Sequence, residues 1–293
     1  MFHLTLENAK GEQIVLTNRE TEYQVIGVDG LEPPKAALIS STVVGMDGAK
    51  FQSSRLEERN IVIRIRINGD VPANRNRLYR YVHAKQYCKV LYKDALHSVF
   101  AEGHIDTIEC PVFTNSEIMQ ISIVCHDPYL QSLTEMITNI SRIMAMFSFP
   151  FSFGAGGLVE GTITDSAIEF GRLDNNPNVN IFNEGIDTGL IIEMHISGGQ
   201  VVNPALYNVY TREGFRFNLT LNDGDIVTVN TNRGQKSVTL LRDGIKQNIL
   251  NHIAAGSVWL QLHEGDNIFT VSADEGAESM FTYWKHRTRY EGV

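Results

Sequence analysis

The sequence has few cysteines and no long apolar run, and these shortages exclude two classes of protein. Its 293 residues include three cysteines, which are too few and too scattered for a disulfide framework. Its most apolar segment, residues 144–158, is interrupted by serines, a proline and glycines, and it is shorter than the roughly 20 residues that cross a bilayer. Residues 1–11 lack a basic region followed by an apolar stretch, as a secretory signal would need. We therefore expect reduced thiols, synthesis in a cytoplasm and no membrane insertion.

Basic residues are also in short supply. The chain holds 25 Lys and Arg against 34 Asp and Glu, a formal net charge of -9. Residues 1–130 have 14 basic and 16 acidic residues, a net charge of -2, which leaves -7 for the remainder. Affinity for a nucleic-acid backbone needs clustered Lys and Arg that displace counterions. We therefore expect no specific nucleic-acid binding.

Motifs that mark catalytic or cofactor sites are missing from the sequence. There is no G-x-S-x-G motif around a nucleophilic serine. Residues 154–157 (GAGG) lack the spacing and the βαβ surroundings of a dinucleotide-binding loop, and we interpret them as a flexible linker. Residues 45–50 (GMDGAK) lack the spacing and the Ser or Thr of a phosphate-binding loop. We predict no catalytic residue and no bound cofactor.

The nearest candidate for a metal site is a set of sulfur and imidazole ligands. It comprises Cys110, Cys125 and His126, with Cys88 as a distant fourth member. The sequence has neither a C-x-x-C nor an H-x-x-x-H motif, which close ligands of a zinc site would form. We interpret the cysteines as core residues of strands and predict no metal site.

Two pairs of carboxylates have the composition of a glycosidase site. Asp223 lies close to Asp225, and Glu184 lies close to Asp187. All four occupy predicted turns, where acidic residues are common for structural reasons. We therefore interpret them as turn residues.

The clearest local pattern is a strict alternation in residues 60–68 (NIVIRIRIN). Alternation places four isoleucines on one face of a strand, and burial of each stabilises the fold by about 1.5 to 3 kcal/mol. Arg64 and Arg66 fall on the opposite face, which is either solvated or part of an interface. Residues 74–88 then show helical spacing, with Asn74 as a potential N-cap. Further strands are predicted at residues 89–92, 98–104 and 117–125.

A second helix is predicted between the two halves of the chain. Residues 132–135 (SLTE) match a capping box, and apolar residues follow at helical spacing up to Phe147, before Pro150. The glycines at 154–157 then mark a junction. The predicted organisation is an N-terminal β-sandwich with a helix at residues 1–130, a linker at 131–160 and a C-terminal β-sandwich at 161–293.

The C-terminal part is predicted to form a series of short strands separated by hairpin turns. Turn sequences such as those at residues 222–224, 231–234, 243–244 and 264–267 recur about every 8 to 12 residues. This spacing predicts an antiparallel sandwich or jelly roll. Strands are predicted at residues 167–171, 179–183, 188–195, 202–210, 214–221, 225–230, 236–242, 257–262 and 267–273.

Aromatic residues of this part are candidates for a stacking platform. We predict that the alternating set is core, because aromatics in half-buried strands usually pack inward. That set comprises Tyr207, Tyr210, Phe215 and Phe217. Trp259 and Trp284 are also predicted to be buried, although an exposed Trp is a frequent anchor in interfaces and sugar sites.

With these segments placed, the sequence resembles the distal tail proteins of siphophages over almost its whole length. In the first half the resemblance rests on residues 30–34 (GLEPP), 45–48 (GMDG) and 127–129 (DPY), and on the order of the isoleucine strand and the following helix. In the second half it rests on residues 221–230 (LNDGDIVTVN), 234–241 (GQKSVTLL) and 262–267 (LHEGDN). The order of these motifs is more specific than any one of them.

The resemblance implies a structural virion protein without enzymatic activity. Its N-terminal domain would form a ring of probably six copies, and its C-terminal galectin-like domain would project outward. The implied partners are the tail tube protein, the tail-associated tip protein and a receptor-binding protein of the baseplate. The implied location is the tail tip of a bacteriophage assembled in the host cytoplasm.

Two other functions remain open at the level of sequence. A carbohydrate-binding module for host attachment would use Trp259 and Trp284, but neither is followed by Glu three residues later, as in sugar-binding galectins. A cell-wall glycosidase would rest on the acidic turns alone.

Overall fold

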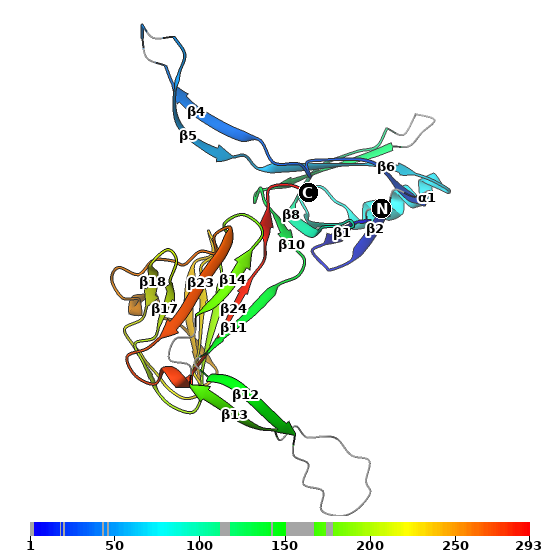
Figure 1. Ribbon diagram of the computed structural model, residues 1–293. Helices are drawn as coiled ribbons and strands as arrows, with labels where there is room; N and C mark the ends of the chain where they lie inside the picture. The colour runs from blue at the N-terminus through cyan, green and yellow to red at the C-terminus, as the bar shows by residue number, and fades with distance from the viewer. Residues whose placement is uncertain are drawn as a thin grey trace, which may run out of the picture. The chain divides into compact units, whose positions relative to one another are not determined.

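The computed structural model divides the chain into two compact units (Figure 1). It describes all residues except 1–2, 18, 20, 43, 46, 112–117, 142, 151–166 and 174–177. Unit 1 consists of Met1–Glu135 together with Arg287–Val293, and unit 2 is the continuous segment Met136–His286. Unit 2 is therefore inserted into unit 1 and is joined to it by two passes of the chain.

Unit 1 is built around a sheet that closes on itself. Its strands run in the order β25-β10-β8-β7-β1-β2-β3-β6-β9, and β9 also pairs with β8. The weakest pairing is between β2 and β3, which share a single parallel bridge between Thr17 and Gln24. The elements are β1 (His3–Asn8), β2 (Gln13–Thr17), β3 (Tyr23–Asp29), β4 (Ala36–Ser41), β5 (Lys50–Leu56), β6 (Arg59–Ile67), α1 (Val71–Tyr81), β7 (Tyr87–Lys93), β8 (Ser98–Glu109), β9 (Ile118–Cys125), β10 (Leu130–Ser132) and β25 (Arg289–Tyr290).

Strand β6 lies at the centre of this core, as its alternation predicts. Its isoleucines pair with β9, which presents its own apolar residues to the same interior. The fully buried residues of the two strands are Ile61, Ile63, Ile65, Met119, Ile121 and Ile123. The predicted mainly β class with one helix in this unit is confirmed. The closure of the sheet was not predicted, and it results from the pairing of β9 with β8.

Helix α1 begins earlier and ends sooner than predicted. Its N-cap is Asp70 and not Asn74, because the Asp70 carboxylate accepts a hydrogen bond from the Ala73 amide at 3.2 Å. The Asn74 side chain instead donates to the Asn68 carbonyl at 2.8 Å. Leu78 is fully buried and anchors the helix on the core. The helix ends at Tyr81, and residues 87–93 continue as strand β7.

Unit 2 consists of two main sheets around a second core. One sheet has the order β11-β24-β15-β20-β21-β22 and the other has the order β14-β23-β17-β18. Buried residues from both form one cluster, which includes Ile192, Val229, Phe269 and Trp284. The elements are β11 (Met136–Ser141), β12 (Ile143–Pro150), β13 (Ala167–Leu173), β14 (Val179–Asn183), β15 (Ile191–Ile196), β16 (Val201–Val202), β17 (Ala205–Asn208), β18 (Glu213–Arg216), β19 (Thr220–Leu221), β20 (Ile226–Asn230), β21 (Ser237–Arg242), β22 (Ile245–Asn248), β23 (Gly265–Ser272), β24 (Met280–His286) and the 3-10 turns Leu250–His252 and Ala277–Ser279.

The predicted helix over residues 132–147 is wrong, because this segment forms strands. β11 pairs with β24 along its whole length, from Met136 opposite His286 to Ser141 opposite Phe281. β12 pairs with β13 in a separate hairpin. The strand partner lies about 140 residues away in the sequence, and its pairing overrides the local helical pattern. The predicted strand at residues 257–262 is also not formed, apart from an isolated bridge at Leu262.

The unit boundaries differ from those predicted at residues 130 and 160. β25 pairs with β10, so that the last residues of the chain return to unit 1. The Val293 amide donates to the Leu31 carbonyl at 3.1 Å, which fixes the end of the chain beside the residues that follow β3. The glycine-rich junction predicted at residues 154–157 lies outside the described residues.

Candidate interaction surfaces

Strands β4 and β5 form a hairpin that extends away from the closed sheet of unit 1 (Figure 1). The two strands pair with each other, from Ala36 opposite Leu56 to Ser41 opposite Lys50, and form a separate two-stranded sheet. Nearly every residue of β5 is exposed. A two-stranded hairpin without further packing is marginally stable in water. The two strands of the hairpin therefore have little packing that stabilises them apart from their own pairing.

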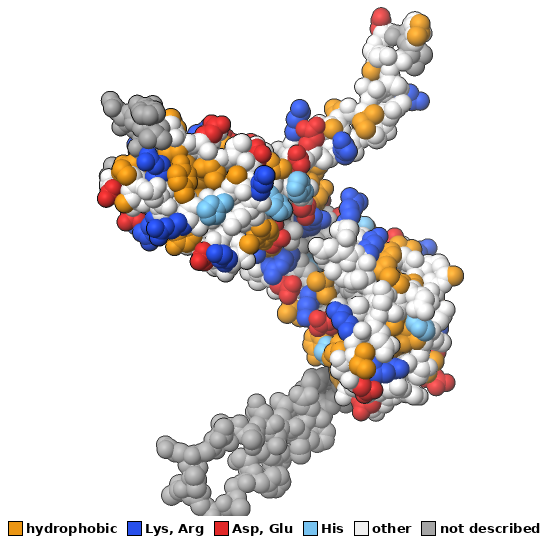
Figure 2. Space-filling view, turned by 180° about the vertical axis from the view of Figure 1, so that it is seen from behind, with side chains coloured by type: hydrophobic (Ala, Val, Ile, Leu, Met, Phe, Trp, Pro, Cys, Tyr) orange, Lys and Arg blue, Asp and Glu red, His pale blue; other side chains and the backbone are white. Residues whose placement is uncertain are grey.

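Large apolar side chains lie on the surface of this hairpin. Leu38 is 71% exposed and Phe51 is 61% exposed, and Ile39 is also exposed. Figure 2 shows hydrophobic side chains along the hairpin, at the upper right of that view. Exposed apolar residues on a thin projecting element cannot be covered by the chain's own core, and grouped exposure of this kind marks an interaction site. Strands β4 and β5 were not predicted from the sequence, because neither has a clear alternation of apolar and polar residues.

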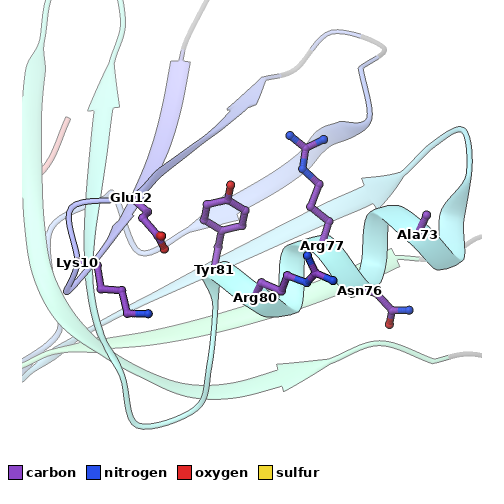
Figure 3. A pocket seen from close by; sticks show the side chains of 7 residues that line it. All are labelled: Lys10, Glu12, Ala73, Asn76, Arg77, Arg80 and Tyr81. Atoms are coloured by element: carbon purple, nitrogen blue, oxygen red, sulfur yellow. The ribbon is translucent and has the colours of Figure 1, made fainter.

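A second candidate surface is a hollow of about 670 Å³ between α1 and the turn that joins β1 to β2 (Figure 3). Arg77, Arg80 and Tyr81 reach it from the helix, and Lys10 and Glu12 reach it from the turn. Three of these five side chains are cationic and one is anionic.

The charges of this hollow are only partly compensated within the chain. Arg77 pairs with Glu22 at 3.3 Å, with both side chains more than half exposed. The Glu12 carboxylate accepts a hydrogen bond from the side-chain amide of Asn8 at 2.8 Å. Lys10 and Arg80 are exposed, and neither forms an ion pair with another described residue. Helix α1 itself contains no acidic residue. The hollow is therefore a basic site on an acidic chain.

Arg64 and Arg66 lie on the outer face of β6, as the alternation predicts. Arg64 forms an ion pair with Asp29 of the neighbouring strand β3 at 2.9 Å, while Arg66 is exposed. An acidic partner on the adjacent strand offsets the repulsion between two arginines on one face. Arg64 is thus part of the sheet's own outer surface.

Three of the four residues considered as metal ligands, Cys88, Cys110 and Cys125, lie in the core of unit 1 or pack against it. Cys88 and Cys125 are buried in the core of unit 1. Burial raises the pKa of the Cys88 thiol to about 12 and that of Cys125 to about 11, so both remain protonated at neutral pH. His126 contacts Glu58 at 3.2 Å. In the part of the chain that the structure describes, no group of three potential ligands is arranged around a common point.

The acidic turns of unit 2 are held by structural contacts. Asp225 is buried and binds Arg242 through both oxygens, with Nε at 2.9 Å from Oδ1. Asp223 caps the Gly198 amide at 2.9 Å. Asp187 contacts His263 at 2.9 Å. The contacts of Asp223 and Asp225 therefore stabilise the sandwich.

The prediction that the aromatic residues are core is correct for only part of the set, and it is wrong for Tyr210, whose side chain is 78% exposed. Phe215 and Phe217 are buried with ring centroids 5.3 Å apart, while Tyr210 is exposed. Trp284 is fully buried and its indole N–H donates to the Thr282 hydroxyl at 2.9 Å. Trp259 is half-buried, with Phe215 at 5.1 Å and the Lys236 ammonium 5.5 Å from its ring. Trp284 is unavailable to a sugar ring for stacking.

None of the described helices is long and apolar enough to cross a membrane.

The exposed surfaces that stand out among the described residues are the apolar β4–β5 hairpin and the basic hollow beside α1, both in unit 1.

Comparison with protein families finds a match in the second half of the chain. Residues 185–290 match the model of the siphovirus-type tail component, C-terminal domain. This match agrees with the resemblance seen in the sequence and confirms it for most of unit 2. A comparison with curated protein sequences finds no match.

Comparison with solved structures finds the same fold over the whole chain. The Dit (gp 19.1) protein of phage SPP1, described as a paradigm of the hub adsorption apparatus in phages that infect Gram-positive bacteria, aligns with a TM-score of 0.67 and 12% identity. The alignment covers 98% of this chain and 99% of that one. A chain of the phage P2 baseplate in its activated conformation, solved with Ca or with Sr, aligns with a TM-score of 0.51 and 8% identity over both full lengths.

Proposed function

We propose that this protein is a distal tail hub, because residues 185–290 match the model of the C-terminal domain of siphovirus-type tail components and the chain has the fold of the SPP1 hub protein. Several copies, six in our proposal, form a ring through unit 1. The ring joins the tail tube to the tail tip and its receptor-binding apparatus, and unit 2 serves as an outward docking domain. The protein acts by assembly and has no catalytic role.

The β4–β5 hairpin is the observation that carries this proposal. It exposes Leu38, Ile39 and Phe51 without a core of its own to cover them. A hairpin that wraps onto the next copy would remove these side chains from water, at about 25 cal/mol per Å² of apolar area. Contacts between different surfaces of identical subunits also close into rings when the rotation permits. A ring component accounts for a projecting apolar element that a monomeric protein would not retain.

The proposed partners follow from the same arrangement. The stacked faces of the ring would bind the tail tube protein on one side and the tail-associated tip protein on the other. Unit 2 would hold a receptor-binding protein in those phages that use one. DNA would pass through the lumen without being bound, because a chain of net charge -9 repels phosphate.

Size-exclusion chromatography with light scattering tests the proposal directly. The wild-type chain should give a species of about six times its 32.8 kDa mass, or a pair of such rings, at high protein concentration. Replacing Leu38 and Phe51 by Ser together should shift the population to monomer, because both side chains lose their apolar contact with the neighbour.

A matched control comes from unit 2. Ile245 is 62% exposed, close to the exposure of Phe51, but lies on the edge strand β22. Ile245→Ser should leave the assembly unchanged. A wild-type protein that stays monomeric at every concentration, and tails without a ring at their tip in micrographs, would contradict the proposal.

A further inference from the structure

We propose that the basic hollow beside α1 binds the acidic end of strand β8 of the neighbouring copy in the ring. This inference rests on the proposed ring and assigns it a polar contact. Its donor side is Lys10, Arg77 and Arg80, and its acceptor side is Asp106 and Glu109.

The donor side is positively charged and accessible. Lys10 and Arg80 are exposed and form no ion pair with a described residue, and Arg77 is shared with the exposed Glu22. Guanidinium groups bind carboxylates through two parallel hydrogen bonds, which gives such a contact direction as well as charge. Tyr81 lines the same hollow and offers a phenol beside the cations.

The acceptor side lies on the outer surface of β8. Asp106 and Glu109 are exposed, and neither forms an ion pair with a described residue. Glu102, which precedes them on the same strand, forms an ion pair with Lys89 at 3.8 Å. The last residues of β8 extend beyond β7, which begins opposite His104, so this end of the strand is paired on one side only. Two carboxylates on a strand end therefore project from unit 1 without a counterion among the described residues.

The strand order places the two surfaces on opposite sides of unit 1. In the closed series β8-β7-β1-β2-β3-β6-β9, strand β2 is as far from β8 as it is from β9, and β9 and β8 are neighbours. The hollow lies at the start of β2, whereas the carboxylates lie on β8. A head-to-tail ring contact requires two different surfaces on two sides of the subunit, which these supply.

The register places the two surfaces toward the same end of the sheet. Asn8 at the end of β1 is opposite Cys88 of β7, and Cys88 is opposite Gly103 of β8. The β1–β2 turn follows Asn8 in the same direction in which Asp106 follows Gly103, because successive pairs are antiparallel. A second copy is therefore an occupant that matches the hollow in charge and in side, with both surfaces toward the same end of the sheet.

Charge reversal and its rescue test the contact in the full-length protein. Arg77→Glu with Arg80→Glu should raise the apparent dissociation constant of the ring by about tenfold or more, since like charges then face each other. Asp106→Lys with Glu109→Lys should do the same. The variant with all four changes should recover assembly, because the pairing is restored with the signs exchanged. A milder pair, Lys10→Gln with Arg80→Gln, tests the hollow without adding repulsion.

Matched controls separate this contact from general charge effects. Arg233→Glu with Lys246→Glu reverses two exposed charges in unit 2 and should leave the ring unchanged. Circular dichroism should show a wild-type fold for every variant. A ring that survives both reversals, or a loss without rescue in the fourfold variant, overturns the inference while leaving the proposed hub intact. A wild-type monomer overturns the hub itself. Binding of labelled duplex DNA that disappears on Arg77→Glu with Arg80→Glu would assign the hollow to phosphate and also overturn the inference.

Discussion

Arg59 is a single buried residue on which three distant segments of unit 1 converge. It is 2% exposed, and its guanidinium donates to the carbonyls of Pro128 at 2.7 Å and Glu32 at 2.9 Å, as well as to those of Gly30 and Glu291. Burial lowers the pKa of Arg59, and the four carbonyls compensate for the lost hydration. This one side chain ties the loop after β3, the end of β9 and the chain terminus together.

Arg59→Met should destabilise unit 1 by about 3 kcal/mol, because it leaves buried carbonyls without donors. Both tryptophans of the chain lie in unit 2, so tryptophan fluorescence reports the unfolding of unit 2. Both units contribute to circular dichroism, and the part of its change that does not coincide with the fluorescence transition reports the unfolding of unit 1. Urea unfolding should show the loss in circular dichroism and leave the fluorescence transition in place. Arg66→Met, at an exposed position of the same strand, is the control.

The Asp225 carboxyl makes the stability of unit 2 depend on pH, with a loss toward low pH. Burial alone raises the pKa of this carboxyl, but hydrogen bonds from Arg242 and the Asn222 amide outweigh burial and leave the pKa below its usual value. A lowered pKa in the folded state contributes stability that is present above the unfolded pKa of about 4 and is lost as the pH falls through the folded value. The tryptophan transition should therefore weaken below about pH 4.

Asp225→Asn should flatten this acid limb, since the amide does not titrate. It should also lower the stability at neutral pH, because Arg242 loses its charged partner. An unchanged limb in the variant would show that other carboxylates control the acid response of unit 2.

The structural roles of single residues could be predicted where a local sequence pattern determines them. The burial of the β6 isoleucines follows from alternation, and the role of Asp225 as a turn residue follows from its neighbours. The role of Arg59 was not predictable, because its acceptors lie up to 232 positions away in the sequence.

Secondary structure was predicted correctly where the sequence fits one periodicity, and wrongly where it fits two. Residues 133–147 fit helical spacing, but Ile140 faces the core while Ile137 lies outside, as the period of a strand requires. The pairing with β24 satisfies the backbone of β11 and decides between the two. Strands β1 and β2 have alternating burial but were not predicted, whereas β4 and β5 have no buried face and therefore no alternation to detect.

Helix α1 offers a direct test of its start. Asp70→Ala removes the carboxylate that accepts the Ala73 amide and should destabilise unit 1 by about 1 kcal/mol. Asp70→Asn keeps an acceptor at the same place and should cost only a small part of this. Equal losses for the two variants in urea unfolding would show that charge, and not the cap hydrogen bond, accounts for the effect.

The whole molecule is organised as an insertion, which the order of sequence motifs did not indicate. Leu130 of β10 pairs with Tyr290 of β25, and Asp127 forms an ion pair with Arg289, so residues 287–293 complete unit 1. Domain boundaries read from composition place these residues in the second domain, since nothing in the local sequence marks their return.

Deletion of residues 287–293 should therefore weaken unit 1 and spare unit 2. The lost contacts include the pairing with β10 and the acceptor that Glu291 provides to Arg59. The circular dichroism transition should move to lower urea concentration while the tryptophan transition stays. A shift of the tryptophan transition alone would place the terminal residues with unit 2.

We propose that the protein acts through assembly by unit 1, and its molar mass in solution tests this most directly. Light scattering of the wild-type chain, beside the variant with Leu38→Ser and Phe51→Ser, should give a ring of about six times 32.8 kDa for the first and a folded monomer for the second. A wild-type chain that remains monomeric at all concentrations, or a hairpin variant that assembles as well as the wild type, would contradict the account.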